Sequence, residues 1–310
     1  IFSFQDSAVA YISISPRVQV QGNDGVSIQL GTGTILNDYK YITTSSGSKN
    51  KWSVIPTETG IFYLDLLNRS FNLASAEGIK GLSDVEGFHK YFIDELDLNL
   101  QKEDNQLLRK GISIGWDKIT NDVYLSMFKK NSIQTLSFNI AQGGFSSFYD
   151  YDSIFYITTK GKTFTINPEN NNEIYQSYEG NYNEFYGVKK KSTVSFLVNP
   201  EPMVECTLNN LEYKSEAIDI NGNEVQAFTW NKIQVTNEFQ DSNLRDLVFR
   251  DNIRKENRKW RISVPRDKGK VNRMRNTWNL VYLEAENENN YNYRNHDIIA
   301  YYNPNYKMIQ

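Results

Sequence analysis

The chain has few of the residues on which common active sites depend. Its 310 residues include one cysteine, Cys206, and two histidines, His89 and His296, which lie more than 200 residues apart. A single thiol cannot form an intrachain disulfide, so nothing here points to an oxidising compartment. One cysteine and two distant histidines also cannot build a Cys/His zinc site. We therefore expect Cys206 to be a small buried residue and both histidines to be structural or at the surface.

Long apolar runs and the short motifs of common enzymes are absent as well. No hydrophobic stretch approaches the roughly 20 residues that a membrane-spanning helix needs, and no signal peptide is recognisable. Gly31-Thr32-Gly33 is not followed by the Gly-Lys-Ser/Thr of a phosphate-binding loop, and no GxSxG, HExxH or dinucleotide motif occurs. We therefore expect a protein that is not an enzyme and that uses no cofactor, metal or small-molecule substrate.

Aromatic residues are abundant, and they favour an all-β protein. The chain has 20 tyrosines and 17 phenylalanines, whose flat side chains pack well on pleated surfaces. Short alternating segments within residues 1–50 predict half-buried strands, with a turn at 22–25. The chain opens on Ile1 and not on methionine, from which we expect a processed or partial piece of a longer polypeptide.

A strand, an Asx-rich turn and a second strand recur three times after residue 50. The turns begin at Asp65, Asp117 and Asn167, which are 52 and 50 residues apart. An Asp or Asn at this place accepts hydrogen bonds from the backbone ahead of it and closes a hairpin. A period near 50 residues is typical of propeller blades, although chance similarity among hairpins gives the same pattern. Propellers usually have 4 to 8 blades, so we expect upstream chain to complete the ring.

One short helical insertion is expected between residues 78 and 106. Phe88, Tyr91, Phe92 and Leu96 fall at helical spacing, and Ser83-Asp84 offers an N-cap. The acidic residues that follow lack the alternating ligands and central glycine of a calcium loop. We therefore expect these acidic residues to form a solvent-exposed face.

A second domain is expected after Lys189-Lys190-Lys191. Successive short strands with almost no helical period predict an antiparallel β-sandwich or platform. Asn221-Gly222-Asn223 predicts a hairpin turn before a strand at 225–230, and residues 244–255 fit a short helix. We therefore assign residues 1–188 to propeller blades and residues 189–310 to the C-terminal platform.

The candidate functional residues lie in a basic stretch of the second domain. Between Arg245 and Arg275 there are 12 lysines and arginines against 4 acidic residues, a balance of about +8 in a chain whose net charge is −3. Clustered cations attract polyanions or an acidic neighbouring subunit. The candidates for an interface or a DNA-facing surface are Arg254, Lys255, Arg258, Lys259, Trp260, Arg261, Arg266, Arg273 and Arg275.

Two functional interpretations of this stretch stay open beside that of an ordinary solvated loop. Cations interleaved with Trp260 and Trp278 fit a surface that holds a nucleic acid backbone without reading its sequence. The other interpretation, which we favour, places them at subunit interfaces, where arginines bind carboxylates of a neighbour.

Several segments resemble the tail stabilisation or muzzle proteins of crAss-like phages of gut bacteria. The resemblance runs from about residue 30 to the C-terminus. The matching segments are LNDYKYI at 36–42, SGS at 46–48, GIFYLD at 60–65, GLSD at 81–84, NEFQ at 237–240 and RKWRISVPR at 258–266.

This resemblance implies a structural protein of the virion, at the distal end of a short phage tail. It implies a muzzle or nozzle-type ring around the DNA exit channel, similar to the hexameric, propeller-bearing nozzle proteins of other short-tailed phages. The expected partners are further copies of the chain, other tail proteins and phage DNA without sequence specificity. The family brings no catalytic residues, and its proteins are much longer. The alternatives are a propeller adhesin that binds host-surface glycans and a glycan-cleaving enzyme with paired carboxylates.

Overall fold

A computed structural model describes most of the chain. The described residues are 1–13, 18–21, 27–30, 38–85, 87–96, 103–129, 132–149, 152–159, 161–170, 172–268 and 272–305. Contacts divide the chain into two compact units, Ile1–Glu179 and Gly180–Gln310. The division thus falls between residues 179 and 180, whereas the sequence places it between 188 and 189. The expected turn at 22–25 and Gly31-Thr32-Gly33 lie outside the described residues.

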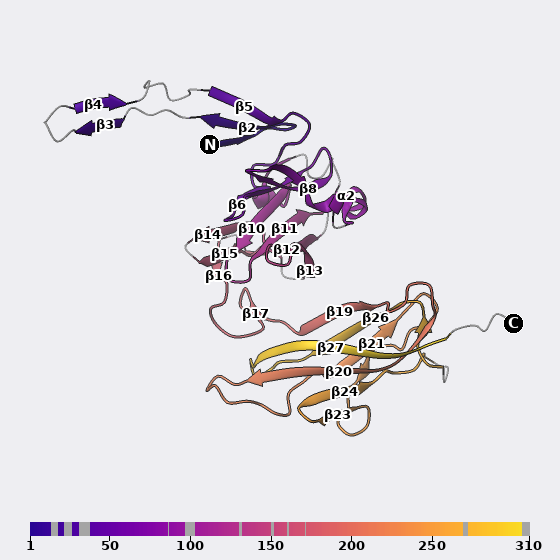
Figure 1. Cartoon of the computed structure of the whole chain (residues 1–310). Helices are drawn as coiled ribbons and strands as arrows, with labels where there is room; N and C mark the ends of the chain where they lie inside the picture. The colour runs from indigo at the N-terminus through magenta and orange to yellow at the C-terminus, as the bar shows by residue number, and fades with distance from the viewer. Residues whose placement is uncertain are drawn as a thin grey trace. The chain divides into compact units, whose positions relative to one another are not determined.

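The N-terminal unit is built from separate antiparallel sheets that follow one another along the chain (Figure 1). The first sheet has the order β1-β2-β5, and the hairpin β3–β4 pairs only within itself. The next two sheets have four strands each, β6-β7-β8-β9 and β10-β11-β12-β13, and the last has the order β14-β15-β16. The strand bounds are β1 Phe2–Phe4, β2 Val9–Ser13, β3 Val18–Gln21, β4 Ser27–Leu30, β5 Asp38–Thr43, β6 Val54–Pro56, β7 Ile61–Asp65, β8 Ser70–Ser75, β9 Gly78–Gly81, β10 Ile112–Asp117, β11 Asp122–Phe128, β12 Ile133–Asn139, β13 Gly144–Tyr149, β14 Tyr156–Thr159, β15 Lys162–Ile166 and β16 Ile174–Gln176.

A single hydrophobic core joins the two four-stranded sheets. Phe62 and Phe71 from β7 and β8 pack with Leu125 and Phe138 from β11 and β12, and each is at most 3% exposed. Full burial of such side chains contributes roughly 1.5–3 kcal/mol each. The alternating apolar residues of these strands therefore hold the sheets face to face.

Strand β10 lies at the centre of this unit, between the first strands of the neighbouring sheets. The Ile114 amide donates to the Trp52 carbonyl beside β6 at 2.8 Å, and the Thr158 hydroxyl of β14 donates to the Trp116 carbonyl at 2.6 Å. Gly115 permits the close approach, because a Cβ there would lie 2.3 Å from the Tyr156 ring. The first strands of the three sheets are thus side by side.

The three predicted hairpins and their turn chemistry are confirmed. Asp65 accepts the Asn68 amide at 2.9 Å, Asp117 accepts the Ile119 amide at 2.9 Å, and Asn167 accepts the Glu169 amide at 2.9 Å.

The period of about 50 residues, however, holds for the turns and not for the sheets, so its use as a blade period is wrong. The hairpins take different places in their sheets, since β7–β8 and β15–β16 are second and third strands while β10–β11 are first and second. The sheets themselves begin at Val54, Ile112 and Tyr156, which are 58 and 44 residues apart.

The helical insertion is confirmed, but its predicted cap is wrong. It contains α1 (Leu82–Val85), α2 (His89–Glu95) and the 3₁₀ turn η1 (Gln106–Leu108). Phe92 and Leu96 are buried in the core, and Phe88 and Tyr91 pack against it, as the helical spacing predicts. Phe88 takes the N-cap position of α2 without a side-chain bond.

The C-terminal unit consists of two antiparallel sheets with the short hairpin β17–β18 before them. One sheet has the order β19-β26-β21-β22; in the other, β20 pairs with β24, β25 and β27, and β24 pairs with β23. Figure 1 shows β20 and β27 running alongside each other, and both are 13 residues long. The bounds are β17 Glu184–Phe185, β18 Val188–Lys189, β19 Ser192–Val198, β20 Cys206–Ile218, β21 Lys232–Thr236, β22 Arg245–Asp246, β23 Ile253–Glu256, β24 Lys259–Ser263, β25 Arg275–Asn276, β26 Asn279–Ala285 and β27 Asn292–Pro304.

Both sheets of this unit turn one face toward a shared core. Leu211 and Tyr213 of β20, Ile262 of β24, Val235 of β21 and Val281 of β26 are at most 1% exposed. Period-two alternation along each strand sends the residues between them to the outer faces. The core therefore fixes which side chains the unit presents to its surroundings.

Two local predictions for this unit are wrong. The Asn221-Gly222-Asn223 turn forms, with Asp219 accepting the amides of Asn221 and Asn223, but residues 225–230 form no strand. The long ladder between β20 and β27 takes the place of that hairpin. Residues 244–255 hold β22, turns and the start of β23 where a helix was expected.

The expectation of a mostly β protein with antiparallel sheets and a short helical insertion is therefore confirmed. A closed propeller is not found among the described residues. In that part of the chain no helix is long and apolar enough to cross a membrane.

Candidate functional site

The nine residues predicted from the basic stretch lie in the sheet built around β20 or in the segments that connect its strands. Arg254 and Lys255 belong to β23, Arg258 to the turn that follows, and Arg275 to β25. The remaining five belong to β24 or to the segment between β24 and β25: Lys259, Trp260, Arg261, Arg266 and Arg273.

Alternation along β24 separates the cations from the tryptophan. Trp260 and Ile262 point into the core and are 3% and 0% exposed, whereas Lys259 and Arg261 lie on the outer face. The Lys255 ammonium sits 5.2 Å from the centre of the Trp260 ring and covers it further. A core residue cannot stack on a base, so Trp260 is not part of a nucleic-acid-binding surface of this unit.

On the outer face of this sheet, cations and carboxylates alternate. Arg254 pairs with Glu256 at 3.2 Å, Lys259 with Glu212 at 2.8 Å, Lys214 with Glu216 at 3.6 Å and Arg275 with Glu205 at 3.1 Å. The hydrogen bond that the Lys259 ammonium donates to Glu212 raises the pKa of that ammonium. We call this surface, made of these eight residues and Arg261, the charged face. It is close to neutral, although its stretch of sequence is strongly basic.

The carboxylates of the charged face were not foreseen among the candidate residues. Glu212 and Glu216 lie on β20, 33 and 29 residues before Arg245, where the basic stretch begins. The signal that could have found them is the alternation within 206–218, where Glu212, Lys214 and Glu216 share one face. Their distance in the sequence concealed the pairing.

Arg258 stands in an unusual backbone conformation at the edge of the charged face. It forms, with Asn257, the two-residue turn between β23 and β24, and both have positive φ, 50° for Asn257 and 64° for Arg258. Such turns strongly prefer glycine at the second position. Within the described part of the chain, the exposed Arg258 side chain makes no ion pair or hydrogen bond. Arg258 therefore adopts a backbone conformation that is unfavourable for arginine, and no ion pair or side-chain hydrogen bond with another described residue offsets this cost.

The other candidate arginines gather near the end of β24. The Arg261 guanidinium lies 5.6 Å from the Tyr301 ring, and Arg273 donates to the Asn209 side chain at 2.8 Å. A shallow hollow beside them is lined by Arg266, Arg273, Tyr301, Asn209, Asn210, Ser263 and Asn303, among others, and by no carboxylate. Two arginines thus line this hollow without a carboxylate among the described residues that line it.

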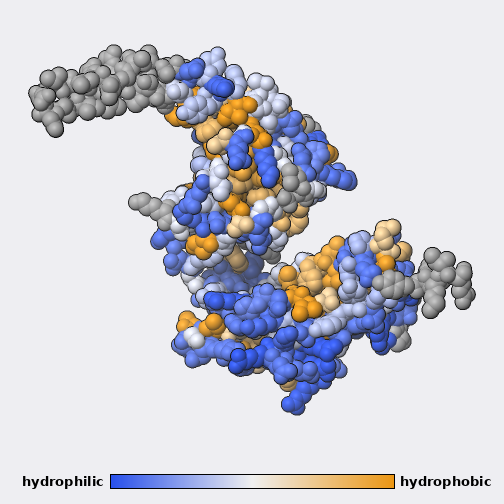
Figure 2. All heavy atoms as spheres, viewed as in Figure 1, coloured by the Kyte–Doolittle hydropathy of each residue, from blue (hydrophilic) through white to orange (hydrophobic). Residues whose placement is uncertain are grey.

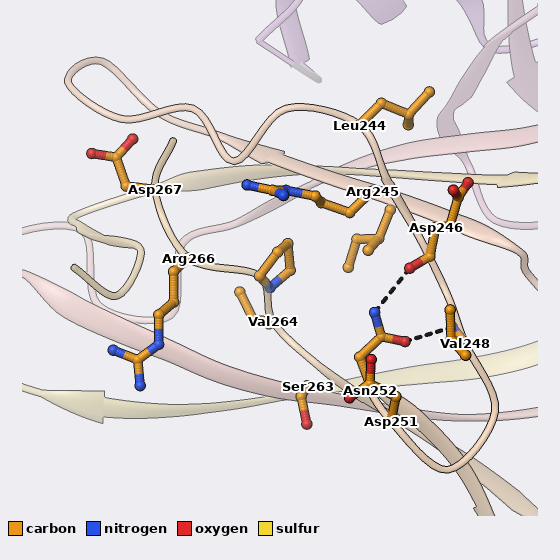
Figure 3. Close-up of a pocket in the computed structure, with 12 residues that line it drawn as sticks. Leu244, Arg245, Asp246, Val248, Asp251, Asn252, Ser263, Val264, Arg266 and Asp267 are labelled. Carbon is orange, nitrogen blue, oxygen red and sulfur yellow. Dashed lines mark hydrogen bonds between the residues drawn. The ribbon is translucent and has the colours of Figure 1, made fainter. Parts of the chain in front are cut away.

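A second hollow lies where the two sheets of the unit meet (Figure 3). The Asn252 side chain shapes its wall, donating to the Asp246 carbonyl at 2.8 Å and accepting the Val248 amide at 2.7 Å. Figure 3 shows the carboxylates of Asp246, Asp251 and Asp267 at separate places around the hollow.

His89 and Cys206 lie outside the site, whereas His296 contacts one residue of the charged face. His89 pairs with Asp84 at 2.9 Å in the N-terminal unit, and His296 lies 3.4 Å from Glu216 on β20. Cys206 is buried, and burial raises the pKa of its thiol. Among the described residues, no three acidic, histidine or cysteine side chains are grouped so that they could hold a metal ion.

Comparison with known proteins gives matches over most of the chain. Residues 1–169 match a family model described as Crassvirus muzzle protein, and residues 180–267 match one described as Crassvirus muzzle protein C-terminal domain. The muzzle protein of Bacteroides phage crAss001 is 25% identical over 317 residues, which cover 97% of this chain and 22% of that protein. The chain thus spans about a fifth of the length of this relative.

Proposed function

Because the chain belongs to the Crassvirus muzzle protein family, a structural component of the phage tail, we propose that it forms part of an oligomeric ring around the DNA exit channel. In this proposal the ring has six copies, as in the nozzle proteins of other short-tailed phages, to which the muzzle family is similar. The role is mechanical, not enzymatic: buried sheet faces make a rigid wall, and outer faces hold neighbouring polypeptides in place. Family membership is the observation that carries this proposal.

Within this ring the N-terminal unit supplies propeller blades. Three successive antiparallel sheets of three or four strands, β6–β9, β10–β13 and β14–β16, fit this role. Their first strands β6, β10 and β14 lie side by side, as the inner strands of neighbouring blades do around a propeller axis.

The charged face fits a contact with a neighbouring polypeptide of the tail better than a DNA-binding surface. A phosphate backbone is held by cations whose charge is not already compensated. Here carboxylates lie beside Arg254, Lys259 and Arg275, and they would repel phosphates. Exposed ion pairs contribute only about 0–1 kcal/mol each to stability. Breaking them to form ion pairs with a neighbouring polypeptide therefore costs little.

Arg258 supports the same assignment. A residue held in a costly conformation is retained where its side chain serves function. Its cation projects from the rim of the charged face and is not compensated there. A carboxylate on a neighbour would bind it in the two-pronged geometry that arginine allows.

The test is a charge reversal with a matched control. Arg258→Glu, alone and with Arg254→Glu, should reduce the yield of rings and of infectious particles, while circular dichroism shows an intact fold. Lys80→Glu reverses an exposed cation of β9 in the N-terminal unit and should leave both yields unchanged. Unchanged assembly in the Arg258 variants would refute the role of the charged face.

A DNA-binding measurement separates the two interpretations of the cations. Fluorescence polarisation with a labelled duplex should show weak binding that changes little with Arg258→Glu. Tight binding that falls steeply with salt and with this substitution would instead assign the face to DNA. Binding of host-surface glycans to the purified protein would favour the adhesin.

A further inference from the structure

The edge strand β19 of the C-terminal unit is open to pairing along its whole length. Its seven residues pair with β26 without a bulge, and no other described strand pairs with β19. Its sequence, STVSFLV, contains no charged residue and no proline. Natural sheets usually protect such an edge, because its free N–H and C=O groups readily pair with another strand.

The other edges of the two sheets in this unit have such protection. Strands β22 and β25 are only two residues long, and three of the four residues of β23 are charged. The long strand β27 carries Arg294, His296 and Asp297, and its register with β20 shifts at two places. Among the described edges of this unit, β19 is therefore the exception.

The core is also less well covered along β19. Val194 and Phe196 point inward and pack against the core, but both stay partly exposed. Their register partners on β26, Leu283 and Val281, are fully buried. Figure 2 shows hydrophobic side chains gathered over β19. A further strand beside β19 would cover the inward row and bond to the free main-chain groups.

The hairpin β3–β4 of the N-terminal unit is a sheet without a third strand. Its register runs from Val18 with Leu30 to Gln21 with Ser27, and it pairs with no other described strand. A two-stranded hairpin on its own is at most marginally stable in water. A strand of another sheet beside it would therefore stabilise it.

The place of this hairpin in the chain supports a role outside its own sheet. Ser13 of β2 and Asp38 of β5 are register partners, so a turn of two residues would be enough to join these strands. Residues 14–37 stand between them instead, and long connections within a unit commonly carry function. The sheet β1-β2-β5 does not use the added hairpin.

The open edge and the unpaired hairpin are complementary in their main-chain groups. An extended strand is the partner that matches an edge, because its N–H and C=O groups recur at the spacing of the edge. The strand sequences VQVQ at 18–21 and SIQL at 27–30 contain no charge and alternate apolar with polar residues. Such alternation suits a strand with one side toward a core and one toward solvent.

We propose that hairpin β3–β4 of one copy of this chain pairs with strand β19 of the next copy and extends its sheet. Two different surfaces of identical subunits then meet head to tail, and repetition of such a contact closes a ring when the rotation permits it. The inference rests on the proposed ring and names one of its subunit contacts. It is separate from the charged face, which lies on the other sheet of the C-terminal unit.

Cysteine cross-linking tests this pairing directly. The native Cys206 is 2% exposed, so an introduced surface cysteine is the accessible thiol of the chain. Two differently tagged full-length proteins, one with Gln19→Cys and the other with Ser195→Cys, are co-expressed and treated with a short bismaleimide. We expect a cross-linked species that carries both tags, which can form only between copies.

The control pair has Ile220→Cys in place of Ser195→Cys. Ile220 lies in a turn of the same unit and is 92% exposed, so it measures chance encounters of an accessible thiol. Rings in which Gln19→Cys and Ser195→Cys cross-link no more than this control would overturn the inference and leave the proposed function standing. A protein that stays monomeric would overturn both.

Removal of the hairpin adds a second readout. Replacement of residues 14–37 by Asn-Gly preserves the pairing of β2 with β5, because this turn joins register partners such as Ser13 and Asp38. Ring assembly of this variant should require at least about ten times more protein. The thermal unfolding of the separated subunit should stay the same.

Charges on the edge test the other partner of the pairing. Thr193→Lys with Leu197→Lys places two cations at exposed positions of β19, and lysines are a means by which natural edges resist pairing. This double variant should lose assembly to the same extent, whereas Ile220→Lys should leave it unchanged. Normal assembly of either the hairpin-free chain or the double lysine variant would refute the pairing.

Discussion

Replacing Arg258 by glycine should stabilise the C-terminal unit. The residue has φ 64°, a left-handed conformation that costs a side-chain-bearing residue about 1–2 kcal/mol and costs glycine almost nothing. Glycine also makes the unfolded chain more flexible, which returns part of the gain, about 0.4–1 kcal/mol. No ion pair or hydrogen bond with another described residue is lost with the side chain. The net gain in the free energy of unfolding is therefore about 0.5–1 kcal/mol.

Calorimetry of the purified chain measures this gain. For a unit of this size, Arg258→Gly should raise the transition of the C-terminal unit by about 2–5 °C. Arg266→Gly is the matched control, because Arg266 does not have a positive φ and the same change should lower stability or leave it unchanged. A lower melting temperature for Arg258→Gly would refute the strain on which the functional role of this arginine partly rests. A more stable variant that assembles poorly would support that role.

Three further changes test the packing and electrostatics. The Lys191 ammonium holds the pKa of Glu284 below its ordinary value. The contribution of Glu284 to stability is therefore present above about pH 4.3 and is lost as pH falls through the lowered pKa. In urea unfolding between pH 3 and 6, the free energy of unfolding should depend less on pH in Glu284→Gln than in the unchanged protein. Trp260→Ala should cost about 3–5 kcal/mol in the same assay, as for a core residue, and an unchanged midpoint would contradict its burial. Asp65→Ala should cost about 2–4 kcal/mol, because it leaves the amides of Gly47 and Asn68 without their acceptor; a loss below 0.5 kcal/mol would show that the turn does not need it.

Local structure was well predicted where a few neighbouring residues decide it. Asp65, Asp117 and Asn167 close their hairpins through bonds to amides two or three positions ahead, so the signal lies within one turn. The helix α2 likewise follows from the spacing of Phe88, Tyr91, Phe92 and Leu96. The same local reasoning failed for residues 225–230, because β20 pairs with β27, far along the chain.

The sequence predicted where the candidate residues lie along the chain, but not the charge of the surface that they form. The sequence locates the cations of the basic stretch, but their electrostatic character depends on Glu212 of β20, which lies beside Lys259, and on Glu205 just before β20, which lies beside Arg275. It also treats Trp260 as a surface ring, although alternation along β24 turns it into the core. Charge counted along a sequence and charge displayed on a sheet differ whenever distant strands share a face.

Electron microscopy of the purified protein tests the central claim most directly. The account predicts closed rings of several copies, in which Arg258 and the charged face of each copy contact another polypeptide. Particles that remain single copies at every concentration, or rings in which the charged face touches only solvent, would contradict it.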